Sequence, residues 1–135
     1  MSEAIEFDLV EEYNTLDIGI TVDANLRSGD LDIDVDARID TGSTYCVFNR
    51  YFGEELGIEI ETGLSVMIGT ATGSFHAFGH ELVLTVVGLD FVSTVYFAES
   101  EYFDRNVLGR IGFLDRVKLG LVEPEGKLYL GRYDR

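Results

Sequence analysis

The sequence has little cysteine, few basic residues and no long apolar run. Its single cysteine, Cys46, excludes an intrachain disulfide, which suits a reducing compartment. A lone cysteine in an apolar stretch is expected to be a small buried hydrophobe. Ten basic residues stand against 25 acidic ones, a formal net charge of −15. Because such a charge repels phosphates, no nucleic acid is expected as a partner.

The absence of long apolar runs argues against a protein with a membrane-spanning helix. No stretch approaches the ~20 residues that a membrane-spanning helix needs. The first six residues are acidic and lead into no apolar stretch, so they do not resemble a secretion signal or a transit peptide. We therefore expect a cytoplasmic protein with no membrane partner. The length of 135 residues and the 46% hydrophobic composition exclude general disorder and predict one domain over residues 1–135.

Apolar and polar residues alternate with a period of two along most of the chain, which is the pattern of half-buried strands. The expected strands cover 16–22, 31–39, 64–68, 75–87, 91–97, 118–122 and 127–130. Turn residues predict a hairpin link at 25–30, a flexible tip at 69–74 and a terminal turn at 124–126. Short helices are expected at 49–56, capped by Asn49, and near 111–117. The whole pattern predicts an all-β fold, a small closed or semi-closed β-barrel with one or two short helices.

Two groups of candidate metal ligands are expected to bind no metal. The alternating aspartates of 30–36 are spread along a solvated strand face rather than gathered around an ion. His76 and His80 lie in an expected strand, and the chain has no further histidine to complete a site. Structural or exposed positions are expected for both histidines.

Asp40-Thr41-Gly42-Ser43 is the first motif that carries chemistry. The apolar strand before it stops in a glycine turn, a geometry that can hold a carboxylate in a rigid, partly buried position. Gly42 has no Cβ and so lets the backbone approach the carboxylate. Its N–H and the Ser43 hydroxyl are candidate hydrogen-bond donors to Asp40. Alone, the motif is also compatible with an ordinary turn.

A second motif, Asn106-Val107-Leu108-Gly109-Arg110, follows the expected strand at 91–97 and precedes the second expected helix. The glycine-rich tip at 69–74 lies between the two motifs. This order resembles the retropepsin-like aspartic proteases, the retroviral type and its cellular and bacterial relatives, over residues 16–132. Asp40 to Ser43 resembles the active-site motif of that family. Val107, Leu108 and Gly109 resemble its apolar-glycine signature, which packs behind the active-site loop.

The resemblance implies an aspartic endopeptidase that hydrolyses a peptide or protein substrate without a metal or a cofactor. Two carboxylates about 3 Å apart share one proton, so that one accepts a proton from water and the other donates to the scissile carbonyl. Since the chain has one Asp-Thr-Gly, the second carboxylate is expected from Asp40 of a second copy in a homodimer. The resemblance implies that Thr41 locks the two loops together, that Gly42 and Ser43 hold the carboxylates, and that a flap tip closes over the substrate. The substrate-binding residues of that tip are Gly69, Thr70, Ala71, Thr72 and Gly73.

Arg38 departs from the family's pattern, which has an apolar residue two positions before the aspartate. Alternation places Arg38 on the side of Asp40, toward the cleft. Arg38 is therefore a candidate substrate-binding residue that selects an acidic or polar side chain. Two other interpretations fit Arg38 equally well. Its positive charge keeps Asp40 ionised and impairs catalysis, or its side chain reaches solvent. The alternative to the enzyme is a catalytically inactive dimerisation or peptide-binding module, and a third hypothesis is a monomeric barrel with an incidental Asp-Thr-Gly.

Overall fold

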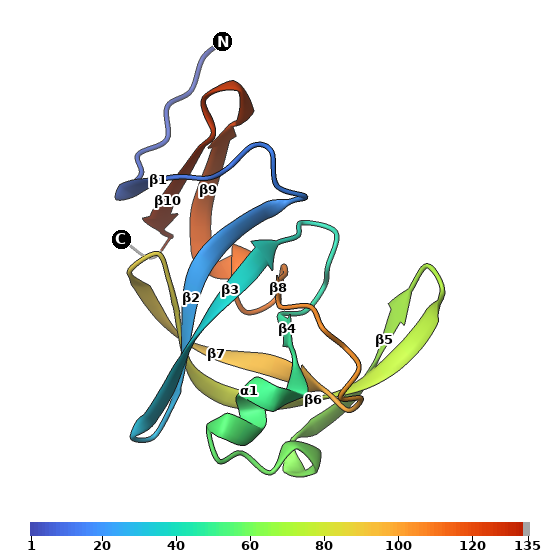
Figure 1. Cartoon of the computed structure of the whole chain (residues 1–135). Coiled ribbons are helices and arrows are strands. Elements are labelled where there is room, and N and C mark those ends of the chain that lie inside the picture. The colour runs from blue at the N-terminus through green and yellow to red at the C-terminus, as the bar shows by residue number, and fades with distance from the viewer. Residues whose placement is uncertain (134–135) are drawn as a thin grey trace.

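A computed structural model describes residues 1–133 (Figure 1). Its strands are β1 (Leu9–Glu12), β2 (Ile20–Ser28), β3 (Leu31–Ile39), β4 (Val47–Phe48), β5 (Leu64–Thr70), β6 (Gly73–Val86), β7 (Leu89–Ala98), β8 (Val107–Leu108), β9 (Val117–Val122) and β10 (Lys127–Arg132). Its helices are α1 (Arg50–Glu55) and three single-turn 3₁₀ helices, η1 (Ile60–Thr62), η2 (Leu114–Arg116) and η3 (Glu123–Glu125).

The larger sheet closes on itself. Its strands are hydrogen-bonded in the order β2-β3-β8-β4-β7-β6-β5, and β2 also pairs with β6, which completes the ring. β5 and the facing part of β6 extend beyond this ring as a hairpin, seen at the right of Figure 1. The expected all-β fold built on a small barrel is confirmed.

The second sheet has the order β1-β10-β9 and joins the two ends of the described chain. The hairpin of β9 and β10 was expected from the sequence and is confirmed. β1 pairs with β10 in the same chain, with Leu9 opposite Leu130. Leu128 and Leu130 are fully buried, so this sheet packs against the barrel core through β10.

The core lies inside the barrel and fixes the strands that carry the two sequence motifs. Its largest fully buried side chains include Phe48, Phe97, Phe113 and Leu108. Burial of one such side chain contributes about 1.5–3 kcal/mol. Cys46 is also fully buried, as its apolar neighbours indicated.

The first expected strand begins later than its alternation indicates. Leu16 and Ile18 are 91% and 84% exposed, and the strand starts at Ile20. The Asn14 side chain accepts a hydrogen bond from the Leu16 N–H at 2.9 Å, and the Asn14 carbonyl accepts one from the Asp17 N–H. These local bonds form a turn that competes with strand pairing.

Three other boundaries differ from the sequence prediction. β2 runs to Ser28, so only residues 29–30 link it to β3, and Gly29 takes the left-handed φ of +61° that this tight link needs. At the expected tip of 69–74, only residues 71–72 lie outside strands. The predicted helix at 111–117 is reduced to the single turn of η2, whereas α1 forms with Asn49 as its cap.

Candidate active site

The barrel places the two sequence motifs side by side. β3 pairs in parallel with β8, with Arg38 opposite Val107 and Ile39 opposite Leu108. The Asp40 N–H donates to the Leu108 carbonyl at 3.0 Å, which extends the pairing by one residue. Asp40 is therefore held at the end of a hydrogen-bonded strand, while its side chain is exposed in the single chain rather than partly buried as expected.

The turn after Asp40 orients the carboxylate. The Gly42 N–H donates to Asp40 Oδ1 at 2.9 Å, as the motif predicted. A Cβ at Gly42 would lie 3.2 Å from that oxygen, so a side chain here would crowd the carboxylate. The Ser43 hydroxyl was expected to bind Asp40 as well, but it donates to the Tyr45 carbonyl at 2.8 Å. The exposed Thr41 hydroxyl has no hydrogen bond within the described chain.

Gly109 supports this loop from behind. A Cβ at this position would lie 2.3 Å from the Tyr45 carbonyl oxygen and 2.7 Å from that of Ser43, so only glycine fits. The residues after it donate two backbone hydrogen bonds to the loop, from Arg110 to Ser43 and from Ile111 to Thr44, both at 2.8 Å. The Asp40 loop is thus attached to the second motif along most of its length.

Cys46 is buried beside this loop. Its sulfur accepts a hydrogen bond from the Gly109 N–H at 3.3 Å. Burial nevertheless raises the pKa of the Cys46 thiol to about 12. The thiol is therefore protonated near neutral pH and is not a nucleophile.

A groove of about 360 Å³ separates the Asp40 loop from the β5–β6 hairpin. The loop contributes Asp40, Gly42 and Ser43 to its lining. The remaining lining residues are Gly69, Thr70, Ala71 and Thr72 of the hairpin tip, the apolar Val47, Ile68, Phe75, Phe103 and Val107, and the cationic Arg105. The structure therefore gathers most of the expected site residues around one groove, with Leu108 and Gly109 buried behind it.

Three of the expected catalytic and substrate-binding residues lie outside this groove. Thr41 and Gly73 are not part of its lining. Arg38 lines a neighbouring hollow of about 190 Å³ that shares Asp40, Arg105 and Val107 with the groove. A Cβ added to Gly19 would meet the Arg38 side chain at 2.7 Å, so the stem of Arg38 lies against the start of β2. Arg38 is on the Asp40 side of β3, as alternation predicted, but does not reach the groove under the hairpin.

The loop between β7 and β8 supplies groove residues that the sequence reasoning missed. Phe103 stacks on Phe75 of β6 with ring centroids 4.8 Å apart, and Arg105 lies two residues before Val107. Alternate residues of a strand lie on the same face, so the period of two continued backward from Val107 would have indicated Arg105 as a further groove residue. Asn106 fixes the end of this loop, since its side chain donates to the Asp36 carbonyl and accepts from the Asn49 N–H.

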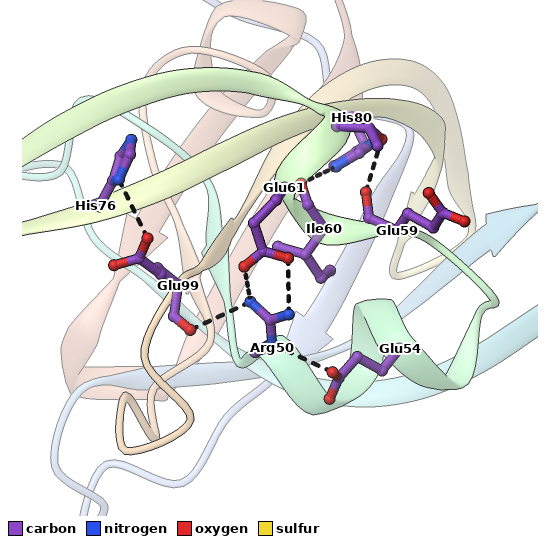
Figure 2. Close-up of polar contacts among 9 residues, drawn as sticks. Arg50, Glu54, Glu59, Ile60, Glu61, His76, His80 and Glu99 are labelled. Atoms are coloured by element: carbon purple, nitrogen blue, oxygen red, sulfur yellow. Dashed lines mark hydrogen bonds and ion pairs between the residues drawn. The ribbon is translucent and has the colours of Figure 1, made fainter.

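The other end of that loop is fixed at Glu99, as Figure 2 shows. Arg50 of α1 binds the Glu61 carboxylate through two nitrogens and donates to the Glu99 carbonyl at 3.2 Å. His76 of β6 contacts the Glu99 carboxylate at 3.4 Å through Nδ1. Its Nε2 contacts the Ser65 hydroxyl. The second histidine, His80, contacts the Ile60 carbonyl. Both histidines thus have structural contacts.

Among residues 1–133, no group of three or more histidine, cysteine, aspartate or glutamate side chains is arranged to hold a metal ion. Over the same part of the chain, no helix has the length and apolar character needed to span a bilayer.

The barrel, its projecting hairpin and the Asp40 loop together define a retropepsin-like fold. This chain is similar to the crystal structure of a retropepsin-like aspartic protease from Rickettsia conorii, with a TM-score of 0.67 and 18% identity over 90% of this chain and 96% of that one. The solution structure of the simian foamy virus protease matches with a TM-score of 0.43 and 22% identity over 67% of this chain and 87% of that one. Comparison with protein-family models and with curated sequences finds no match.

Proposed function

We propose that this chain is an aspartic endopeptidase that acts as a homodimer. The observation that carries the proposal is the position of Asp40. Its carboxylate is oriented by the Gly42 N–H and lines a groove whose opposite side is the β5–β6 hairpin tip. The similarity of the fold to a retropepsin-like aspartic protease supports the same reaction class.

The chemistry needs a second carboxylate, which a second copy of the chain would supply. In the proposed site, a water molecule lies between two Asp40 side chains that share one proton. The ionised carboxylate accepts a proton from the water as it attacks the peptide carbonyl, and the protonated one donates to the carbonyl oxygen. The two Thr41 hydroxyls, which have no partner within the described part of one chain, are free to bond across the two-fold axis.

Two exposed apolar side chains support dimerisation next to Asp40. Leu16 and Ile18 are almost fully exposed, and their loop enters β2 at Ile20, which pairs with the residue just before Asp40. Covering one leucine or isoleucine side chain contributes about 1.5–3 kcal/mol. A copy related by a two-fold axis would cover this pair and bring its own Asp40 to the site.

The substrate is a peptide in an extended conformation. The groove is bounded by the tip of a hairpin whose outer strand, β5, is a sheet edge. Such an edge offers unpaired backbone groups to an extended chain. Closure of the tip would exclude water from the reacting carbonyl.

Subunit mixing tests both parts of the proposal. Asp40→Asn should abolish cleavage of a peptide library, whereas Asp30→Asn, a matched change in the hairpin link between β2 and β3, should not. Wild type and Asp40→Asn are then mixed in equal amounts and allowed to exchange subunits. If each site needs two Asp40 carboxylates, only the wild-type dimers are active, and the mixture has about a quarter of the activity of wild type at the same total protein concentration. Retention of about three quarters would show that one carboxylate in a dimer suffices, and retention of about half would show that each chain acts independently. Cleavage by Asp40→Asn itself would refute the mechanism.

The second candidate is a catalytically inactive dimerisation or peptide-binding module. The position of Arg38 in the hollow beside Asp40 favours it, since a nearby guanidinium stabilises an ionised carboxylate and opposes proton sharing. This candidate predicts that the wild type dimerises and binds peptides without cleaving any of them. Recovery of cleavage in Arg38→Leu would assign the loss to that guanidinium.

A further inference from the structure

The groove is chemically asymmetric. Its lining contains one cation, Arg105, and one carboxylate, Asp40, among mainly apolar or small residues. The ion pairs of residues 1–133 involve Arg50, His76 and Lys127, and no carboxylate or hydrogen-bond acceptor in that part of the chain binds the Arg105 guanidinium. Arg38 has no such partner either, but Arg105 is the cation that lines the groove together with Asp40.

Charge balance separates this groove from the hollow next to it. The hollow contains Arg38 and Arg105 against three carboxylates, Asp36, Asp40 and Asp104, a formal balance of −1. The groove contains Arg105 against Asp40 alone. In the proposed dimer the two Asp40 side chains share one proton, so two Arg105 guanidiniums face a single negative charge. The groove is then locally cationic, and the hollow at Arg38 is not.

The loop that carries Arg105 is fixed at both ends. Glu99 at its start is held by Arg50 and His76 (Figure 2), and Asn106 at its end is hydrogen-bonded to Asp36 and Asn49. Phe103 anchors the middle by stacking on Phe75. With its backbone held, the Arg105 side chain loses less freedom on binding a ligand than it would on a loose loop.

We infer that Arg105 forms a subsite for an acidic side chain, and that the substrates are peptides with Glu or Asp next to apolar residues. A guanidinium binds a carboxylate through two parallel hydrogen bonds, and the adjacent aromatic wall of Phe75 and Phe103 takes apolar neighbours. This inference rests on the proposed function. The two-fold axis adds a specific expectation, since each copy contributes one Arg105 and the preferred acidic residues lie at equivalent distances on both sides of the cleaved bond.

Cleavage-site profiling with a diverse peptide library tests the inference, followed by peptide pairs that differ only in Glu or Gln at the enriched position. Wild type should prefer the Glu peptide by about tenfold in kcat/KM, the effect of one charged hydrogen-bonded contact. In Arg105→Gln the ratio should fall to near one, and Arg105→Glu should prefer Lys at that position. Arg27→Gln, which makes the same change in net charge at an exposed site on β2, should keep the wild-type ratio.

The outcomes separate the inference from the proposed function. If no library peptide is cleaved in an Asp40-dependent way, the proposed function fails and the inference fails with it. Asp40-dependent cleavage without a preference for acidic residues overturns the inference alone. A preference that is lost in Arg38→Gln but kept in Arg105→Gln also overturns it, because the subsite would then lie in the neighbouring hollow.

Discussion

Replacement of Gly109 by alanine tests whether the second motif supports the Asp40 loop. The added Cβ would lie 2.3 Å from the Tyr45 carbonyl oxygen, about 1 Å closer than the ~3.3 Å at which carbon and oxygen usually meet. A shift of that size would break the hydrogen bonds from Arg110 to Ser43 and from Ile111 to Thr44. Each lost bond with a group left unsatisfied costs about 1–3 kcal/mol, so the loss of two such bonds in Gly109→Ala should lower the free energy of unfolding by about 2–6 kcal/mol.

Urea denaturation followed by circular dichroism measures this loss. The matched control is Gly69→Ala, because a Cβ there has no atom within 4 Å and the backbone is not left-handed. Its free energy of unfolding should stay within about 0.5 kcal/mol of wild type. A Gly109→Ala protein as stable as the control would refute the reasoning, since it would mean that the loop and the second motif separate without cost.

Two further predictions concern ionisable groups away from the groove. The guanidinium of Arg50 lowers the pKa of the Glu61 carboxyl through hydrogen bonds, so the stabilisation from this pair is present above the ordinary glutamate pKa and lost as pH falls through the lowered one. Glu61→Gln should therefore reduce the free energy of unfolding by about 0.5 kcal/mol at neutral pH, a small value because the Glu61 side chain is exposed. The difference in free energy from wild type should shrink below about pH 4, and an equal difference at both pH values would contradict this reasoning. The buried Cys46 thiol, with its pKa raised to about 12, should not react with a thiol reagent at about pH 8 until denaturant is added, as followed by absorbance; rapid reaction of the native protein would show that the site opens.

The strands with one buried apolar face and one exposed polar face could be predicted from the sequence. Along β3, Val35 and Ala37 are buried while their neighbours Asp34 and Asp36 are exposed, so the period of two carries the information. The same alternation wrongly predicted a strand before Ile20, because a sequence pattern does not show whether a partner strand is available for pairing. The pairing of β2 with β6, which closes the barrel, joins segments about 60 residues apart and has no local signal.

The Asp40 loop was predicted in outline, but one of its hydrogen bonds was predicted wrongly. The hydrogen bond from Gly42 to Asp40 follows from the glycine turn itself. The Ser43 hydroxyl had a second acceptor within reach, the Tyr45 carbonyl, and sequence reasoning could not decide between the two. Arg38 shows the same limit, since alternation gives the side of β3 on which it lies but not that its side chain lies beside Gly19 and lines the neighbouring hollow.

The hydrogen bonds within a single chain show which parts of the proposed site need no second copy. The Asp40 carboxylate is oriented by Gly42, and its loop is attached to the second motif, without any help from a partner. A second copy would then add a carboxylate and a cover for Leu16 and Ile18 rather than rebuild the loop. Because the reacting groups are ordered beforehand, little of the association energy is spent on arranging them. Activity would therefore follow the dimer population, which two chains of −15 each make sensitive to salt and to protein concentration.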